Sequence, residues 1–296
     1  MKKSWKEVRL EIHSSRVEAA SNFLIEQGSP GITQEAVKGS AGRKRERLIA
    51  YYSNDRGFLA TRKKINAYLR AICKSRRTDF TLSARTIQEE KWAESWKENF
   101  KPIEVTPRLV IRPPWESWPN QPGQIVIEIN PGMAFGTGTH PSTQMCLQFI
   151  EEVIPSFPKT PSVLDVGTGS GILTIAARKM GVKKIMAIDI DPVAIDCARA
   201  NARANRADRG IAFRTGSPEG LKTPFDLVVA NLLPQELLSV APALSRLVAR
   251  SGKLIASGFL VKQEKEMAAA FRKQGVGKLK ARRQKGWAAW VLQRSP

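Results

Sequence analysis

The sequence predicts an α/β protein in which a doubly wound, Rossmann-like domain follows a small α+β domain of ferredoxin-like order. Two observations predict the large domain. From Pro161 onward, strand-like apolar runs alternate with helix-like segments, as a mostly parallel sheet requires. The first of these runs, VLDV, ends in a glycine-rich turn, GTGSG, that leads directly into a helix. The third observation, a β-α-β-β-α-β order within residues 1–87, predicts the small domain.

The glycine-rich turn has the composition of a ligand-binding turn. Gly167, Gly169 and Gly171 allow positive φ angles and a close approach of the backbone to a ligand. The helix that follows offers unpaired N–H groups to an anionic group. The next strand, KIMAID, ends in Asp189, where a carboxylate can accept hydrogen bonds from two ribose hydroxyls.

The spacing of this turn argues against a nicotinamide dehydrogenase. It reads G-x-G-x-G, not G-x-G-x-x-G, and Asp165 stands two residues before the first glycine. The pattern resembles the S-adenosyl-L-methionine site of the class I methyltransferases, which implies that the glycines meet the methionine end and Asp189 the ribose. A glycine turn without a ligand is disfavoured, because strand, turn, helix, strand and acid all fall in register.

Periodicity predicts the individual elements. In the small domain, strands alternate apolar and polar residues, and helices place apolar residues on one face; the expected elements are a strand at 8–12, a helix at 16–27, a short extended piece, a strand at 47–53, a helix at 57–75 and a strand at 80–87. In the large domain the expected strands are 162–167, 184–190, 211–216, 225–233, 253–259 and 286–293, and the expected helices are 171–180, 192–205, 235–250 and 261–274.

A connecting segment is expected between the two domains. Residues 88–101 place Trp92, Trp96 and Phe100 at i, i+4 and i+8, which predicts a linker helix with one apolar stripe. The expected domains are therefore a substrate-recognition domain at 1–87, the linker helix at 88–101 and a catalytic domain at 102–296. Two extended segments, RLVIRPPW and QIVIEINPG, are expected to lead into the catalytic core.

Composition excludes several classes of protein. The 296 residues are 42% hydrophobic, but no apolar run reaches the length of a membrane helix, and no apolar stretch follows the N-terminal lysines as in a signal peptide. The three cysteines form no C-x-x-C motif, and with two histidines a metal site is not expected. A cytoplasmic protein without membrane contact is expected.

The net charge of +21 is unevenly distributed. Residues 1–88 contain 19 Lys and Arg against 8 Asp and Glu, and residues 262–296 contain 10 against 2. The segment between them contains 19 against 17. Such basic ends suit RNA, a ribonucleoprotein or an acidic protein, and the alternative is a set of solvated faces without a partner.

A second glycine-rich segment, NPGMAFGTGTHPST, precedes the cofactor strand in the chain. Its glycines predict a pliable loop that folds over the cofactor, and Pro141 starts a helix whose Ser142 and Thr143 cap it or reach the ligand. The alternative is a glycine loop with a capped helix and no ligand. His140 is expected to be a hydrogen-bonding loop residue and not a base.

The segment ANLLP ends the fourth strand of the large domain. Catalytic groups in open α/β sheets gather at the carboxyl ends of strands, where Asn231 can present its amide and carbonyl to the methyl donor or acceptor. The alternative is an asparagine that merely terminates a strand. The motif is not N-P-P-Y, which argues against glutamine or adenine as the acceptor.

Together these segments resemble the family of methyltransferases of large-subunit ribosomal protein eleven (PrmA), strongly from about Trp92 to the C-terminus and by element order before it. The resemblance implies S-adenosyl-L-methionine as cofactor, bound by Thr143, Gly167, Asp189 and Asn231. Gly169 and Phe135 are further cofactor-site candidates, and Asn231 is the expected catalytic, methyl-positioning residue. The family carries Cys in many members where this chain has Thr168.

The same resemblance implies a protein-lysine N-methyltransferase that trimethylates lysine side chains and the N-terminal amine of ribosomal protein eleven, free or on the ribosome. A monomer is expected, with contact to ribosomal RNA through its basic surface. Three alternatives stay open at this point: an RNA methyltransferase acting on ribosomal RNA, a lysine methyltransferase of another protein, and a non-catalytic adapter that binds ribosomal components.

Overall fold

The chain divides into two compact units, Met1–Phe100 and Lys101–Pro296, each of which we describe by itself. The computed structural model describes residues 4–29, 31–37, 45–55, 57–73, 80–88, 100–119, 121–131 and 136–294. Most of the predicted linker helix, including Trp92 and Trp96, lies outside the described residues, as do Gly132 and Phe135 of the glycine-rich loop.

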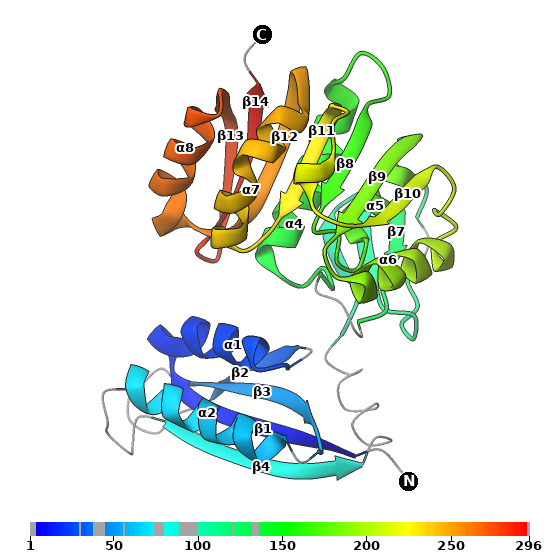
Figure 1. Ribbon diagram of the computed structural model, residues 1–296. Coiled ribbons are helices and arrows are strands. Elements are labelled where there is room, and N and C mark those ends of the chain that lie inside the picture. Colours follow the sequence, from blue (N-terminus) through cyan, green and yellow to red (C-terminus); the bar gives the residue numbers. More distant parts are fainter. Residues whose placement is uncertain are drawn as a thin grey trace. The chain divides into compact units, whose positions relative to one another are not determined.

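The N-terminal unit has the predicted ferredoxin-like order (Figure 1). Its elements are β1 (Ser4–His13), α1 (Val17–Glu26), β2 (Ile32–Val37), β3 (Arg45–Ser53), α2 (Phe58–Ile72) and β4 (Phe80–Gln88). The four strands form an antiparallel sheet in the order β2-β3-β1-β4. The first and third strands thus lie centrally, with the second and fourth at the edges.

Alternation along β1 separates the two faces of this sheet. Val8, Leu10 and Ile12 are buried with Leu24 of α1 and Ile65 of α2 in one hydrophobic cluster. Because successive side chains of a strand point to opposite faces, the intervening residues of β1 lie on the face without helices. The alternate apolar residues of β1 therefore determine which face of the sheet the two helices cover.

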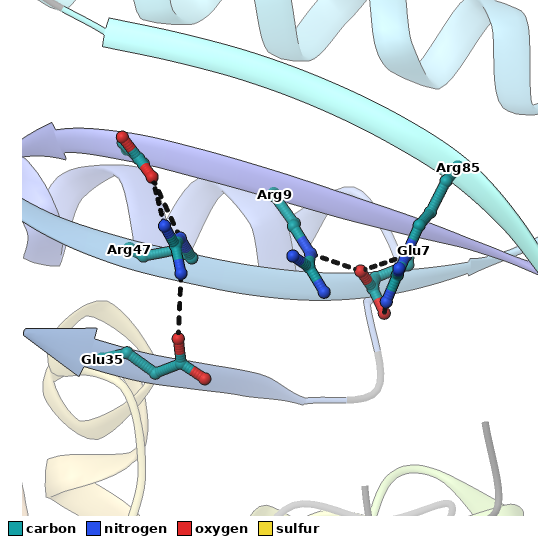
Figure 2. A network of polar contacts seen from close by, with 6 residues as sticks. Glu7, Arg9, Glu35, Arg47 and Arg85 are labelled. Carbon is teal, nitrogen blue, oxygen red and sulfur yellow. Dashed lines mark hydrogen bonds and ion pairs between the residues drawn. The ribbon is translucent and has the colours of Figure 1, made fainter. Parts of the chain in front are cut away.

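The face without helices holds a charged network (Figure 2). Glu7 of β1 is 3% exposed and accepts hydrogen bonds from Arg85 of β4, at 2.8 and 3.0 Å, and from Arg9, at 2.5 Å. Burial raises the pKa of Glu7, but the hydrogen bonds and charges of the two arginines outweigh burial, so this pKa lies below its ordinary value.

The C-terminal unit has the predicted doubly wound architecture. Its seven-stranded sheet has the order β10-β9-β8-β11-β12-β14-β13, in which neighbours from β10 to β12 run parallel. These strands are β8 (Ser162–Val166), β9 (Lys184–Asp189), β10 (Ile211–Thr215), β11 (Phe225–Asn231), β12 (Val248–Leu260), β13 (Val276–Gln284) and β14 (Trp287–Arg294). The fold class predicted from the sequence is confirmed.

Helices cover both faces of this sheet (Figure 1). They are α4 (Pro141–Val153), α5 (Ile172–Lys179), α6 (Pro192–Ala204), α7 (Pro234–Leu247) and α8 (Glu264–Lys273). One hydrophobic cluster joins the sheet to α4 and α5, and a second joins it to α7 and α8. No helix in the described ranges is long and apolar enough to span a membrane.

The structure corrects the prediction at two places. The two extended segments before the core form a small sheet of three strands, β5 (Ile103–Thr106), β6 (Leu109–Arg112) and β7 (Ile125–Glu128). The single final strand is a β13–β14 hairpin. The sequence pattern missed β13 because seven of its nine residues are exposed, and no apolar alternation marks the strand.

We predict that Glu7→Ala lowers the free energy of unfolding by about 1–3 kcal/mol, because hydrogen bonds to a charged acceptor are lost. The lowered pKa means that this contribution is present above the carboxyl's unfolded pKa and is lost as pH falls through the lower, folded one. Denaturant titrations at pH 7 and pH 3 should show the difference shrinking in acid. The exposed Glu26→Ala is the control, and an equal effect of both changes at pH 7 would contradict the prediction.

Candidate functional site

The glycine turn after β8 is tied to the end of β9. The backbone N–H groups of Gly167 and Thr168 donate to the carbonyl of Ile188, at 2.9 and 3.0 Å. The N–H of Gly169 donates to Asp189 Oδ2 at 3.0 Å. Positive φ angles at Gly167 and Gly169 turn the chain toward this strand end. The acid expected to hold a ribose is thus fixed against the turn expected to hold the methionine end.

Asp165 lies beneath the turn as a buried carboxylate. It is 1% exposed, and its Oδ2 accepts hydrogen bonds from the hydroxyls of Thr168 and Thr174, both at 2.7 Å. Its Oδ1 is buried and has no hydrogen-bond partner among the described residues. Burial raises the pKa of Asp165 to about 6, the two threonine hydroxyls lower it, and the negative charge of Asp189 raises it further.

The loop before α4 reaches the same turn. The Ser170 hydroxyl donates to the carbonyl of Gly136 at 2.6 Å. His140 caps α4, because its Nδ1 accepts a hydrogen bond from the Ser142 N–H at 3.3 Å. Its ring packs edge-on against the ring of Trp287, with the two ring centroids 4.5 Å apart. Burial lowers the pKa of His140 to about 4, so the ring is neutral at pH 7. This agrees with the expected hydrogen-bonding role.

Asn231 and Thr143 meet although 88 residues separate them in the chain. The Asn231 side-chain amide donates to Thr143 Oγ1 at 3.2 Å. Thr143 is 1% exposed in the first turn of α4, and Asn231 is half-buried at the carboxyl end of β11. Two residues chosen from separate motifs therefore form one contact.

Leu232 is held between two glycines. A Cβ on Gly167 would lie 2.3 Å from Leu232 Cδ2, and a Cβ on Gly258 would lie 2.0 Å from the Leu232 carbonyl oxygen. Gly258 lies at a bulge of β12, where the pairing with β14 shifts between Ser257 and Phe259. At Gly258 only glycine permits this approach of backbone to backbone, which sets the path of the chain immediately after Asn231.

The structure brings the predicted site residues to one edge of the sheet. Gly167, Gly169 and Asp189 form one cluster, and Thr143 with Asn231 forms another at the end of β11, the strand beside β8. Phe135 lies outside the described residues.

Sequence reasoning gave no site role to two exposed apolar side chains at this edge. Ile190, directly after Asp189, is 73% exposed, and Leu233, two residues after Asn231, is 58% exposed. The sequence indicated both residues in the same way: each is an apolar residue that lies one or two positions after the polar residue that ends a strand. Side chains of this kind suit the planar faces of a ligand.

A hollow of about 1010 Å³ lies at the opposite edge of the sheet, where α5 and α6 end. Its two carboxylates are already ion-paired: Glu128 with Arg112 at 2.8 Å, and Glu116 with Lys101 at 2.7 Å. It contains none of the residues predicted from the sequence motifs, and we place no catalytic group there.

Comparison with known proteins identifies the family. A model of the family described as "Ribosomal protein L11 methyltransferase (PrmA)" matches residues 4–295. The chain belongs to this family. The ribosomal protein L11 methyltransferase of Pelobacter propionicus is 35% identical, over 98% of this chain and 98% of its own. The enzyme of that name from Geotalea uraniireducens is 35% identical over 97% of each chain.

A solved structure shares the fold at comparable identity. The ribosomal protein L11 methylase of Lactobacillus delbrueckii subsp. bulgaricus is 33% identical, with a TM-score of 0.61. The match covers 67% of this chain and 100% of that one. The resemblance to the PrmA family that the motifs predicted is confirmed.

The residues at the carboxyl edge fit S-adenosyl-L-methionine, the methyl donor of this methyltransferase family. The orphan oxygen of Asp165 can accept a hydrogen bond from a donor group of a ligand. The three glycines of the turn have φ between +52° and +80° and no side chains, so a ligand can approach the backbone of the turn closely. Asp189 supplies a carboxylate for hydroxyls, and Ile190 supplies an apolar surface for a ring.

We predict that Gly258→Ala impairs methyl transfer at least tenfold, because the new Cβ displaces the backbone of Leu232 and with it Asn231. Gly181→Ala is the matched control, since Gly181 has φ +94° against +98° for Gly258 and a Cβ there meets nothing within 4 Å. Both changes should cost about 1–2 kcal/mol of stability from the left-handed backbone. Steady-state assays at a temperature where both variants are folded test this, and equal rates would contradict it.

A second prediction concerns Asp165→Asn in the ligand-free protein. An acid whose folded pKa is raised disfavours folding once it ionises, so the penalty grows between about pH 4 and 6 and stays constant above. The effect of the substitution on the free energy of unfolding should therefore be more stabilising at pH 8 than at pH 4, by at most about 3 kcal/mol. Thermal or denaturant unfolding at the two pH values measures this, with the exposed Asp196→Asn as control. A gain that does not depend on pH would refute the raised pKa.

Proposed function

We propose that this chain transfers methyl groups from S-adenosyl-L-methionine to lysine side-chain and N-terminal amines of ribosomal protein L11. The observation that carries the proposal is the arrangement at the carboxyl edge of the sheet, where Asp189 is bonded to the glycine turn and Asn231 to Thr143. The family match over nearly the whole chain supports the choice of substrate.

The site residues would divide the binding of the donor between them. Asp189 accepts hydrogen bonds from the ribose, while Gly167 and Gly169, which have no side chains, let the methionine end approach the backbone of the turn closely. Thr143 orients the Asn231 amide, and Asn231 positions the reacting groups. Bound S-adenosyl-L-methionine supplies an electrophilic methyl group on a sulfonium. Positioning an amine in line with that methyl is worth up to about 7–11 kcal/mol of the barrier.

The acceptor amine must lose its proton before it attacks. For a lysine with a pKa near 10.4 this costs roughly 4–5 kcal/mol at pH 7, and for an α-amine near 8 it costs about 1 kcal/mol. His140 is a poor proton acceptor for either amine, since its pKa is about 4 and its Nδ1 accepts from Ser142. Desolvation beside carbonyl acceptors near Asn231 would lower the cost for lysine.

The proposal includes a division of labour. Residues 1–87 recruit the ribosomal protein, residues 88–101 join the two domains, and residues 102–296 carry out the transfer. Free or ribosome-associated L11 is the partner, and the basic surface contacts ribosomal RNA. The chain works as a monomer in the cytoplasm. The basic N-terminal segment, which contains none of the cofactor motifs, supports this assignment.

We predict that Asp189→Ala weakens binding of S-adenosyl-L-methionine at least tenfold. Each hydrogen bond to the charged carboxylate is worth about 1.5–3 kcal/mol, and two ribose bonds would be lost. Isothermal titration calorimetry measures the affinity, circular dichroism checks the fold, and Asp196→Ala on the exposed side of α6 is the control. Unchanged affinity would remove Asp189 from the site.

We also predict that the purified chain, given labelled S-adenosyl-L-methionine and ribosomal protein L11, places methyl groups on amines. Mass spectrometry should find them on lysine side chains or the N-terminus, and Asn231→Ala should reduce the yield at least tenfold through lost positioning. Assays on intact ribosomes, followed by protease or ribonuclease, identify the labelled macromolecule. Label on RNA alone would favour an RNA methyltransferase, and label on glutamine would contradict the proposed acceptor.

A further inference from the structure

The positive charge of the N-terminal unit is not shared equally by its two faces. On the face without helices, Arg9, Arg47 and Arg85 all pair with glutamates (Figure 2). Arg47 bonds Glu11 at 2.6 Å and lies 3.5 Å from Glu35. Three arginines thus meet three glutamates, and this network adds no net charge to that face.

The helix α2 has the opposite composition. Phe58, Ile65 and Leu69 are buried against the sheet, and the exposed positions include four cations. These four residues, the α2 cations, are Arg62, Lys63, Lys64 and Arg70. No aspartate or glutamate occurs between residues 58 and 72. The whole exposed surface of the helix therefore has one sign of charge.

The geometry of the helix spreads these charges along its outer side. Lys63 and Arg70 lie two turns apart and face the same direction, while Arg62 and Lys64 flank them on either side. From Arg62 to Arg70 the row extends about 12 Å along the axis. The sequence adds Lys74, Arg76 and Arg77 directly after the helix.

The α2 cations are not neutralised within the described chain. Among the described residues, no carboxylate lies within ion-pair distance of any of the four. Both aromatic residues of the helix are already engaged: Phe58 is buried, and Tyr68 stacks on Phe23 of α1, with ring centroids 3.9 Å apart and 5° between the ring planes. The surface therefore offers point charges without a free ring for stacking.

We propose that α2 binds the phosphate backbone of RNA. Four exposed cations on one helix, with no acidic residue between them, match a polymer that bears a negative charge on every phosphate. Because Tyr68 is stacked within the unit, contacts to phosphate and not to bases are expected, so binding does not depend on sequence. The proposal goes beyond methyl transfer, whose chemistry at the carboxyl edge requires no RNA, and it assigns the RNA contact to one helix.

The test measures RNA binding by the full chain without methyl donor or acceptor, so its result is independent of the proposed function. Fluorescence anisotropy follows a labelled RNA duplex of about 20 base pairs between about 50 and 300 mM salt. The α2 variant replaces Arg62, Lys63, Lys64 and Arg70 by Gln. The control replaces four other exposed cations by Gln. They are Lys262, just before α8, and Lys265, Arg272 and Lys273 within it. Both variants lose four charges, so their net charge is the same.

The α2 variant should bind RNA at least tenfold more weakly at about 150 mM salt, and its slope of log affinity against log salt should fall by about three to four. The control should stay within about threefold of the original chain. Equal losses in both variants would mean that only overall charge attracts RNA, which overturns the proposal. Equally tight binding of poly-L-glutamate would point to an acidic protein surface and also overturn it.

Circular dichroism checks the fold of the α2 variant. Should it fail to fold, a double variant, Lys63→Gln with Arg70→Gln, removes only the two charges that lie two turns apart and face the same direction. That double variant should lower the salt slope by about two, because two phosphate contacts are lost. An unchanged slope in the folded double variant would overturn the proposal.

Discussion

The close packing of Leu232 between Gly167 and Gly258 is the constraint on which the catalytic edge depends. It joins the ends of three neighbouring strands, β8, β11 and β12: a Cβ on Gly167 would collide with the Leu232 side chain, and a Cβ on Gly258 would collide with the Leu232 backbone. At Gly258 no rotamer change can relieve the collision, because the atoms in contact belong to the backbone. This packing positions Asn231, which directly precedes Leu232. The hydrogen bond from Asn231 to Thr143 then positions the start of α4.

Two carboxylates at this edge have different surroundings. Asp189 is half-buried, and its two oxygens accept the N–H groups of Gly169 and Asp191. Asp165 is fully enclosed, and burial and the charge of Asp189 raise its pKa. Ionised Asp165 therefore bears an electrostatic cost, which the hydroxyls of Thr168 and Thr174 reduce in part.

Much of this architecture could be predicted from the sequence, because the signals are local. The strand, glycine turn and following acid of VLDVGTGSG and KIMAID specify the parallel core, and Asp189 lies beside Gly169 as that pattern requires. The meeting of Asn231 and Thr143 could not be derived from periodicity, because it depends on α4 packing across the sheet against a strand end 88 residues away. The strand β13 was missed because its polar residues are held by ion pairs: Arg283 bonds Glu264 of α8 at 2.8 Å, and Arg282 bonds Glu152 of α4 at 2.9 Å.

The distribution of charge along the chain is consistent with the demands of the proposed reaction. The methyl donor contains a sulfonium, and the acceptor lysine is a cation until it is deprotonated, so a strongly basic catalytic edge would repel both. Residues 89–261, which include every cofactor motif, hold 19 basic against 17 acidic residues. The excess lies in other segments, and on the open face of the N-terminal sheet Arg9, Arg47 and Arg85 are paired with glutamates. The four exposed cations of α2 have no carboxylate within ion-pair distance among the described residues. A basic protein can thus attract an anionic partner at one surface and keep a nearly neutral site for two cationic reactants at another.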